Sequence, residues 1–112
     1  MLFRSGRFHH DQGAYTARGT NIPHSSATTI LGPYIVPNYR MEVVIAHTNK
    51  VCATSMRGAG HPQGCFTMER LLDRVADAAG LDRTVVRERN MIPFEAMPYT
   101  HRLKTQAGQP IT

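Results

Sequence analysis

The pattern of hydrophobic and polar residues is clearest in two stretches of the chain. Residues 40–48 read R-M-E-V-V-I-A-H-T, a run rich in β-branched residues that predicts a strand. Both faces of this strand are mostly apolar, which favours a buried strand over an edge strand. His47 would then be a core histidine. Asn49 and Lys50 turn the chain towards a shorter extended stretch over Val51–Met56.

The second stretch, Gln63–Ala79, carries a helical pattern in which apolar residues recur every three or four positions. The apolar positions of one face are Cys65, Met68, Leu72, Val75 and Ala79, and Leu71 and Ala76 widen that face. Cys65 is therefore expected to be a small buried hydrophobe. Glu69 and Asp73 fall on the polar face, where we expect solvent. Pro62 fits the entry of this helix, and Gly80 fits its C-terminal stop.

The other predicted elements are short. Asp82 is a suitable N-cap for a second helix over Arg83–Arg89. Asp11–Arg18 is a candidate short strand that Gly13 weakens, and Ser25–Leu31 is a candidate helical turn. Residues 1–10, which include two adjacent histidines, are expected to be irregular.

This order of elements predicts an α+β fold with two or three short strands, one long amphipathic helix and one short helix. One long helix needs a sheet to cover, and so few strands leave the core incomplete. Glycine and proline interrupt residues 19–39, and structureless stretches of that length are uncommon inside compact domains. We therefore expect something outside the chain to hold this segment. The polar tail from Glu95 to Thr112 predicts a surface strand or loop.

Composition narrows the class of protein. A chain of 112 residues suffices for one domain. The net charge is +5, with eleven arginines and two lysines, but the arginines are scattered among acids and there is no tryptophan. Nucleic-acid binding is therefore not expected. No run approaches the roughly 20 apolar residues of a membrane span. Two cysteines without metal-binding spacing, Cys52 and Cys65, indicate free thiols and a cytoplasmic protein.

Residues 57–64 read R-G-A-G-H-P-Q-G, directly before the long helix. A dinucleotide fingerprint needs G-x-G-x-x-G, but here the third glycine comes one position late, and the Gly-Lys-Ser/Thr of a P-loop is absent. Two interpretations stay open. The loop is either a bare strand-to-helix turn or a backbone that approaches a ligand, because glycine permits close approach and helix N-termini favour anions. His61 could donate to such a ligand, but one histidine does not make a metal site.

Three ordered motifs together resemble one known family. They are P-Y-I-V-P-N-Y-R-M-E-V-V-I-A-H-T-N at 33–49, M-R-G-A-G-H-P-Q-G at 56–64, and E-R-L-L-D-R-V-A-D-A-A-G-L-D with V-R-E-R-N-M-I within 69–92. They resemble the first part of the molybdopterin-binding domain of molybdenum hydroxylases, the family of xanthine dehydrogenases, aldehyde oxidases and aerobic carbon monoxide dehydrogenases. D-Q-G-A-Y at 11–15 and P-F-E-A-M-P-Y-T at 93–100 resemble its flanks. The resemblance covers residues 8–103 of a single partial domain, 1–112, with 104–112 as an irregular tail.

The resemblance implies an oxidoreductase that acts on an aldehyde or heterocycle at a molybdenum–molybdopterin centre, with oxygen taken from water. Electrons would leave through iron–sulfur clusters and FAD on partner domains or subunits. It places Arg57 against the molybdenum centre, Gly58 and Gly60 at the cofactor, and Ala59 in the substrate pocket. Xanthine-oxidising members have an aromatic residue where Ala59 stands and an arginine near the position of Ser25. A purine substrate is therefore disfavoured.

The resemblance also implies that essential parts lie elsewhere. The catalytic glutamate of the family falls beyond Thr112, and so do later pterin contacts. We therefore expect a truncated fragment, inactive alone, whose partners are the rest of the large subunit or a split complement and the iron–sulfur and FAD subunits. Whether the chain itself is an enzyme stays open. The alternative is a small stand-alone basic module that binds a protein partner or nucleic acid without catalysis.

Overall fold

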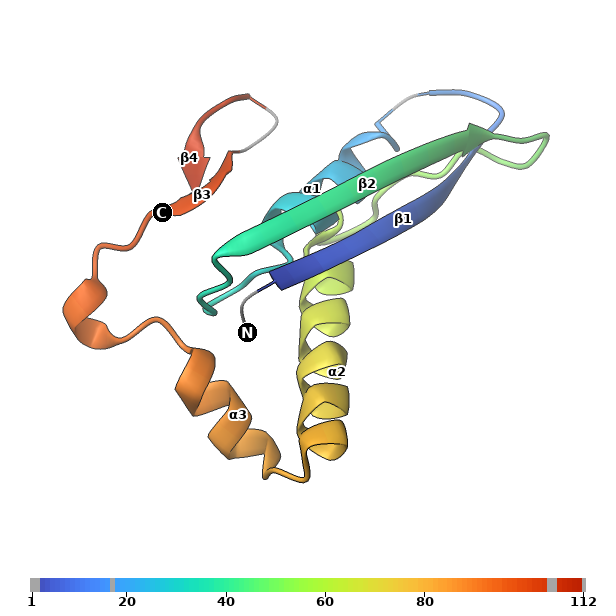
Figure 1. The fold of residues 1–112 in the computed structure, drawn as a ribbon. Coiled ribbons are helices and arrows are strands. Elements are labelled where there is room, and N and C mark those ends of the chain that lie inside the picture. The colour runs from blue at the N-terminus through green and yellow to red at the C-terminus, as the bar shows by residue number, and fades with distance from the viewer. Residues whose placement is uncertain (1–2, 17, 105–106, 112) are drawn as a thin grey trace.

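The computed structural model describes residues 3–16, 18–104 and 107–111. The elements in chain order are β1 (Phe3–Gly13), α1 (Asn21–Thr29), β2 (Asn38–His47), α2 (His61–Ala79), α3 (Arg83–Asn90), the 3₁₀ turn η1 (Phe94–Ala96), β3 (His101–Lys104) and β4 (Pro110–Ile111). Figure 1 shows β1 and β2 as two long neighbouring strands with α1 behind them, and α2 projecting away from this unit. The mixed helix and strand content confirms the expected fold class.

β1 and β2 form a two-stranded parallel sheet whose register runs from Phe3 opposite Asn38 to Gly13 opposite His47, with a shift between Asp11 and Gly13. Parallel strands need a crossover connection, and α1 supplies it. The expectation that the first ten residues are irregular was wrong for Phe3–His10, because pairing with β2 makes a strand of a segment with weak intrinsic strand propensity. The strand expected over Asp11–Arg18 ends at Gly13, and Ala17 lies outside the described residues.

β2 confirms the predicted strand but not its burial on both faces. Its exposure alternates along the strand, so that Met41, Val43 and Ile45 are half-buried whereas Glu42, Val44 and Ala46 are exposed. A two-stranded sheet within this chain leaves one face of β2 open. His47 is exposed, so the prediction of a core histidine was wrong. The stretch expected to be extended over Val51–Met56 forms no strand.

α2 begins at His61, two residues before the predicted start, with Pro62 in its first turn, and Gly80 ends it in the left-handed conformation. Its buried stripe consists of Gly64, Met68, Leu72 and Ala76. Met68, Leu72 and Ala76 are buried as predicted, whereas Cys65, Val75 and Ala79 are exposed. The cause is α1, which packs against Gly64. The predicted cap of α3 is confirmed, because Asp82 accepts hydrogen bonds from the backbone N–H groups of Thr84 and Val85.

Close packing between α1 and α2 organises this part of the fold. A Cβ atom at Gly60 would lie 2.1 Å from the carbonyl oxygen of Ile22, and one at Gly64 would lie 2.9 Å from that of Ser26. The buried Ser26 hydroxyl lies 2.8 Å from the Gly60 carbonyl oxygen, to which it donates. The expectation that 19–39 needs support from outside the chain was therefore wrong at α1, because α2 supplies that support.

A network of ion pairs and hydrogen bonds around Arg87 joins α3 to α2. Arg87 donates to the Glu69 carboxylate and to the Asp73 carboxylate, both at 2.8 Å. The hydroxyl of the buried Tyr34 donates to the other oxygen of Glu69, also at 2.8 Å. The hydrogen bond from Arg87 lowers the pKa of Asp73. Glu69 and Asp73 were expected to face solvent, and this was wrong because α3 folds back over them.

The buried apolar cluster is small. Its members are Ile30, Leu31, Tyr34, Val36, Met68, Leu72, Ala76 and Val86. Large apolar side chains remain exposed elsewhere, including Met56 at 99% and Val51 at 92%. The expected incomplete core is thus observed. The tail from Glu95, predicted to be a surface strand or loop, contains β3 and β4, which pair antiparallel; within its part expected to be irregular, 104–112, Pro110–Ile111 form the short strand β4. Within the described residues, no helix has the length and apolar character that a membrane crossing requires.

Two glycine substitutions test the contact between α1 and α2. Gly60 and Gly80 both have positive φ, 101° and 63°, but no atom lies within 4 Å of a Cβ placed at Gly80. Gly80→Ala should lower the free energy of unfolding by about 1 kcal/mol, the cost of a left-handed alanine. Gly60→Ala should lower it by about 3 kcal/mol, because its Cβ also overpacks the helix contact. Urea unfolding measures both, and equal losses would contradict this account.

The carboxylate of Asp11 predicts a dependence of stability on acid. It accepts hydrogen bonds from the Thr48 hydroxyl at 2.6 Å and from the Lys50 ammonium at 2.9 Å. These bonds, the one from Thr48 most, lower the pKa of Asp11 from 3.8 to about 2. Because the folded-state pKa is depressed, the stabilisation is present above pH 3.8 and is lost as the pH falls towards 2.

Asp11→Asn should therefore reduce the loss of stability over this acidic range, as measured by urea unfolding at several pH values. Asp77→Asn is the control, because Asp77 is another exposed aspartate in an ion pair, with Arg83. The same reduction in both variants would rule out Asp11 as the source.

Candidate functional site

The loop between β2 and α2 has an unusual backbone. Gly58, Ala59 and Gly60 have φ angles of 81°, 42° and 101°. Among the described residues, Ala59 alone has a positive φ without being glycine, and such strained positions cluster at functional sites. The backbone N–H of His61 donates to the Gly58 carbonyl at 2.9 Å, which closes a turn at the start of α2. The four predicted site residues 57–60 thus lie together in one tight loop.

Contacts within the chain explain why this loop is rich in glycine. A Cβ atom at Gly58 would lie 2.7 Å from the ring of Pro62, and one at Gly60 would meet α1. Of the two interpretations left open by the sequence, the strand-to-helix turn therefore accounts for these glycines. The packing fixes the backbone path of residues 58–60. The side of the loop that carries the exposed Arg57 takes no part in it.

The outer side of the loop is basic and open. Arg57 is exposed and forms no ion pair with any described residue. No described side chain caps the N-terminus of α2. The N–H of His61 donates to the Gly58 carbonyl, that of Gly64 donates to the Gly60 carbonyl, and Pro62 has no N–H, so in the first turn the N–H of Gln63 is the one left for an outside acceptor. A guanidinium beside an uncapped helix N-terminus suits an anionic group. Ala59, which lies between Arg57 and the start of α2 in the sequence, is half-buried.

The other chemically interesting side chains do not join this loop in a reactive group. His61 is exposed at the start of α2. Cys52 and Cys65 are free thiols, as expected. Across the part of the chain that the structure describes, no three histidine, cysteine, aspartate or glutamate side chains gather as a metal site.

Sequence reasoning missed Gln12, which supports the segment leading to the loop. Its side chain is wholly buried. The amide donates to the backbone carbonyls of Tyr15 at 3.1 Å and of Ala53 at 3.3 Å, and the backbone N–H of Ala53 donates to the Gln12 carbonyl at 2.8 Å. Gln12 thereby ties the chain after β2 to the end of β1. Its place inside the D-Q-G-A-Y motif was the available signal.

Sequence reasoning also missed Ser26. It follows Ser25, the residue that the family resemblance places where xanthine-oxidising members have an arginine. Both serines lie on α1. A serine in a short helix carries no distinctive pattern, and its bond to Gly60 becomes visible only in three dimensions. A cavity of about 270 Å³ adjoins this contact, with Ser26 and Gln63 among its lining residues.

Comparison with known proteins identifies the family. The family model described as a molybdopterin cofactor-binding domain matches residues 2–91. The xanthine dehydrogenase molybdenum-binding subunit of Escherichia coli O157:H7 is 33% identical over 99 residues, which cover 88% of this chain and 13% of that protein. The nicotinate dehydrogenase large molybdopterin subunit of Eubacterium barkeri is 32% identical over 77 residues, 69% of this chain and 18% of that protein.

A solved structure agrees with these matches. The aldehyde oxidoreductase from Desulfovibrio gigas superposes with a TM-score of 0.76 at 28% identity, over 96% of this chain and 11% of that chain. The present chain thus spans between 11% and 18% of the length of these relatives. Motifs in the right order, sequence matches along most of the chain and a shared fold all agree. This chain therefore belongs to the molybdopterin cofactor-binding domain family of the molybdenum hydroxylases.

Proposed function

We propose that this chain forms one wall of the active site in a molybdenum hydroxylase large subunit. The observation that carries the proposal is the loop 57–60, which presents the unpaired Arg57 beside the uncapped N-terminus of α2. When bound, the molybdenum–molybdopterin group supplies the oxidation of an aldehyde or heterocycle with oxygen from water. The residues of this chain position that group and the substrate.

Arg57 is the residue that we assign to the molybdenum centre. Its planar guanidinium carries five N–H donors and a permanent charge, which suits hydrogen bonding to an anionic group. We also assign Gly58 and Gly60 to the cofactor, as the family resemblance implies. The turn that they form sets the direction in which Arg57 leaves the backbone. The contacts with Pro62 and α1 keep this turn rigid, as a binding wall requires.

Ala59 and Ser25 bear on the substrate. The methyl group of Ala59 leaves the pocket wide and offers no ring to stack on a purine, and Ser25 offers no positive charge. An aldehyde or a smaller heterocycle fits this wall better than a purine. The names of two relatives, a nicotinate dehydrogenase and an aldehyde oxidoreductase, denote such substrates for those proteins.

The remaining walls would come from other polypeptide. We propose that the rest of a large subunit, or a split complement, supplies the catalytic glutamate and further cofactor contacts, and that iron–sulfur and FAD partners accept the electrons. On this proposal the 112-residue chain is inactive alone. The free thiols of Cys52 and Cys65 fit a reducing compartment such as the cytoplasm.

The first test measures cofactor on the isolated chain. Expressed in a host that makes molybdopterin and then purified, the chain should carry molybdenum far below one atom per chain, because one wall gives too few contacts for retention. Metal analysis by mass spectrometry and pterin fluorescence measure the content. Stoichiometric cofactor on the isolated chain would contradict the need for further walls.

The second test examines Arg57 in a complete active site. Residues 8–103 would replace the matching segment of the Desulfovibrio gigas aldehyde oxidoreductase. In this chimera, Arg57→Gln should lower aldehyde turnover by about 10²-fold at unchanged molybdenum content, the typical cost of removing one preorganised donor. Arg57→Lys should restore only part of the turnover, because lysine keeps the charge without the fork of donors.

Arg74→Gln is the matched control, because Arg74 is exposed on α2, about three and a half turns from the loop end of the helix. It should leave turnover unchanged. Full turnover in the Arg57→Gln chimera would remove Arg57 from the site.

A further inference from the structure

The chain between β2 and α2, residues 48–60, turns at the end of β2 and runs back towards the start of α2 (Figure 1). Its first part is joined to the end of β1 by main-chain hydrogen bonds. The N–H of Thr48 donates to the Gly13 carbonyl at 3.2 Å, that of Ala14 to the Lys50 carbonyl at 2.9 Å and that of Ala53 to the Gln12 carbonyl at 2.8 Å. The last residue joined in this way is Ala53, four positions before Arg57.

The side-chain amide of Gln12 binds Ala53 a second time. Its nitrogen donates to the carbonyls of Ala53 at 3.3 Å and of Tyr15 at 3.1 Å, which uses both of its N–H groups. Its oxygen lies 3.2 Å from Nε2 of His10 and can only accept, so this nitrogen of His10 carries the hydrogen. A flipped amide would place its oxygen against two carbonyl oxygens. Ala53 is thus held through both its N–H and its carbonyl by one residue whose side chain is wholly buried.

Two glycines leave the space that this contact needs. A Cβ atom at Gly19 would overlap the Gln12 amide, and one at Gly13 would lie 2.8 Å from the Cα atom of Cys52. Either side chain would displace the Gln12 amide or the chain that it holds. The end of β1 is therefore packed around this amide.

Arg57 lies between two fixed points of the main chain. The point before it is Ala53, and the point after it is the turn at Gly58, which the His61 N–H closes. Across the described residues, 54–57 form no hydrogen bond of their own. The position of the Arg57 backbone therefore depends on the anchors at its two ends, and Gln12 is the side chain that makes the first anchor.

We propose that Gln12 is a positioning residue, which sets the place of Arg57 in the active site by holding Ala53. This inference rests on the role proposed above for Arg57 at the molybdenum centre. Gln12 acts through the main chain of residues 53–57 and touches neither substrate nor cofactor. Without its amide, Ala53 keeps a single main-chain bond, and Arg57 can move away from the position in which its donors act.

The chimera described above, with residues 8–103 in the Desulfovibrio gigas aldehyde oxidoreductase, tests this role, with turnover expressed per molybdenum atom. Gln12→Met keeps the approximate size of the side chain and removes its hydrogen bonds. It should lower kcat for an aldehyde about tenfold, because a small misplacement of a group in the active site has effects of this order. The KM should not change, because Arg57 is assigned to the metal centre and not to substrate binding.

A double-mutant cycle with Arg57→Gln separates positioning from general stability. In a chimera that already carries Arg57→Gln, Gln12→Met should have no further effect on kcat, because the group that Gln12 positions is gone. A merely structural role would lower kcat equally in both backgrounds.

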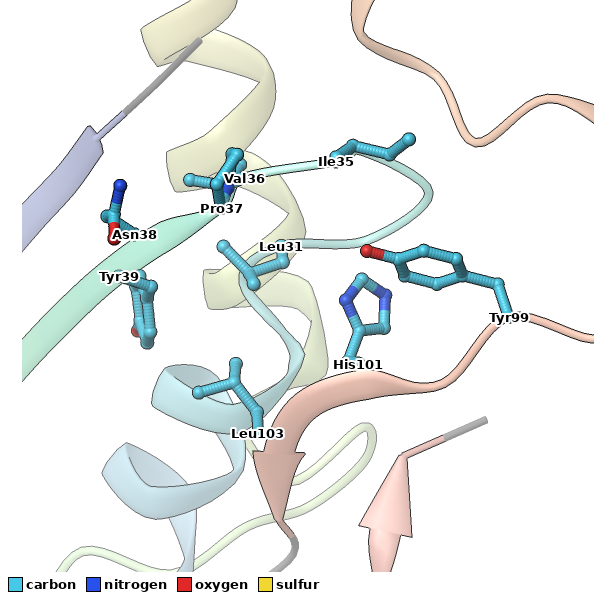
Figure 2. Close-up of a pocket in the computed structure, with 9 residues that line it drawn as sticks. All are labelled: Leu31, Ile35, Val36, Pro37, Asn38, Tyr39, Tyr99, His101 and Leu103. Carbon is cyan, nitrogen blue, oxygen red and sulfur yellow. The ribbon is translucent and has the colours of Figure 1, made fainter. Parts of the chain in front are cut away.

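Tyr39→Phe is the matched control. The Tyr39 hydroxyl donates to the main-chain carbonyl of Ala27 at 2.7 Å, so the variant removes the same kind of hydrogen bond. Tyr39 pairs with Arg4 at the other end of the sheet, about 25 Å from Gln12 at the usual rise per residue. Figure 2 shows Tyr39 beside a groove of about 540 Å³ that none of the residues 10–15 or 48–60 lines. This variant should leave kcat unchanged.

Amide relaxation measured by NMR on the full 112-residue chain is a readout independent of turnover. Gln12→Met should lower the order parameters of residues 53–57 and leave those of α2 unchanged. Gly19→Ala is a second variant, because its Cβ displaces the amide while Gln12 stays in the sequence. It should lower the same order parameters. This measurement decides the question where a chimera takes up no molybdenum.

Three results would overturn the inference. They are an unchanged kcat in the Gln12→Met chimera, an equal loss with and without Arg57 or in Tyr39→Phe, and unchanged order at 53–57 in both variants of the full chain. Each of them leaves the proposed function standing if Arg57→Gln alone lowers turnover. Full turnover in the Arg57→Gln chimera would instead contradict the proposed function itself.

Discussion

The contact between the Ser26 hydroxyl and the Gly60 carbonyl marks the constraint on which the rest of this structure depends. At this point α1 and the start of α2 approach so closely that neither Gly60 nor Gly64 can carry a side chain. The approach fixes the direction in which α2 leaves the β1–α1–β2 unit. It also fixes which side of α2 is buried, namely the stripe through Met68 and Leu72. The position of α3 follows, because Arg87 grips carboxylates on the neighbouring face of α2.

The same constraint explains the dual character of the glycine loop. Its glycines serve packing within the chain, and this packing holds three successive residues at positive φ. A loop held so firmly presents Arg57 outward from a fixed backbone. Rigid support of an exposed charged group is how proteins build binding walls. The internal packing of the glycines is therefore compatible with the external role that we propose for Arg57.

The small core and the open strand edge have one cause. β1 and β2 form a parallel pair, and parallel sheets are ordinarily covered on both faces. In the described residues α1 covers one face only, and the outer edge of β2 has no strand beside it. Val44 on β2 remains exposed as a result. The chain spans 11% of the Desulfovibrio gigas aldehyde oxidoreductase chain and 18% of the Eubacterium barkeri subunit.

Local sequence signals determined the elements whose causes are local. The entry proline and terminal glycine of α2, the Asp82 cap of α3 and the β-branched run of β2 each act through neighbouring residues, so their positions could be predicted. The ordered motifs likewise determined the family, and they placed 57–60 in one loop. Tertiary structure decided the rest. Pairing with β2 made a strand of Phe3–Gly13, α1 selected the buried stripe of α2 and left Cys65 exposed, and α3 turned Glu69 and Asp73 from solvent towards Arg87. Each of these outcomes depends on contacts between residues distant in the chain, which no local pattern records.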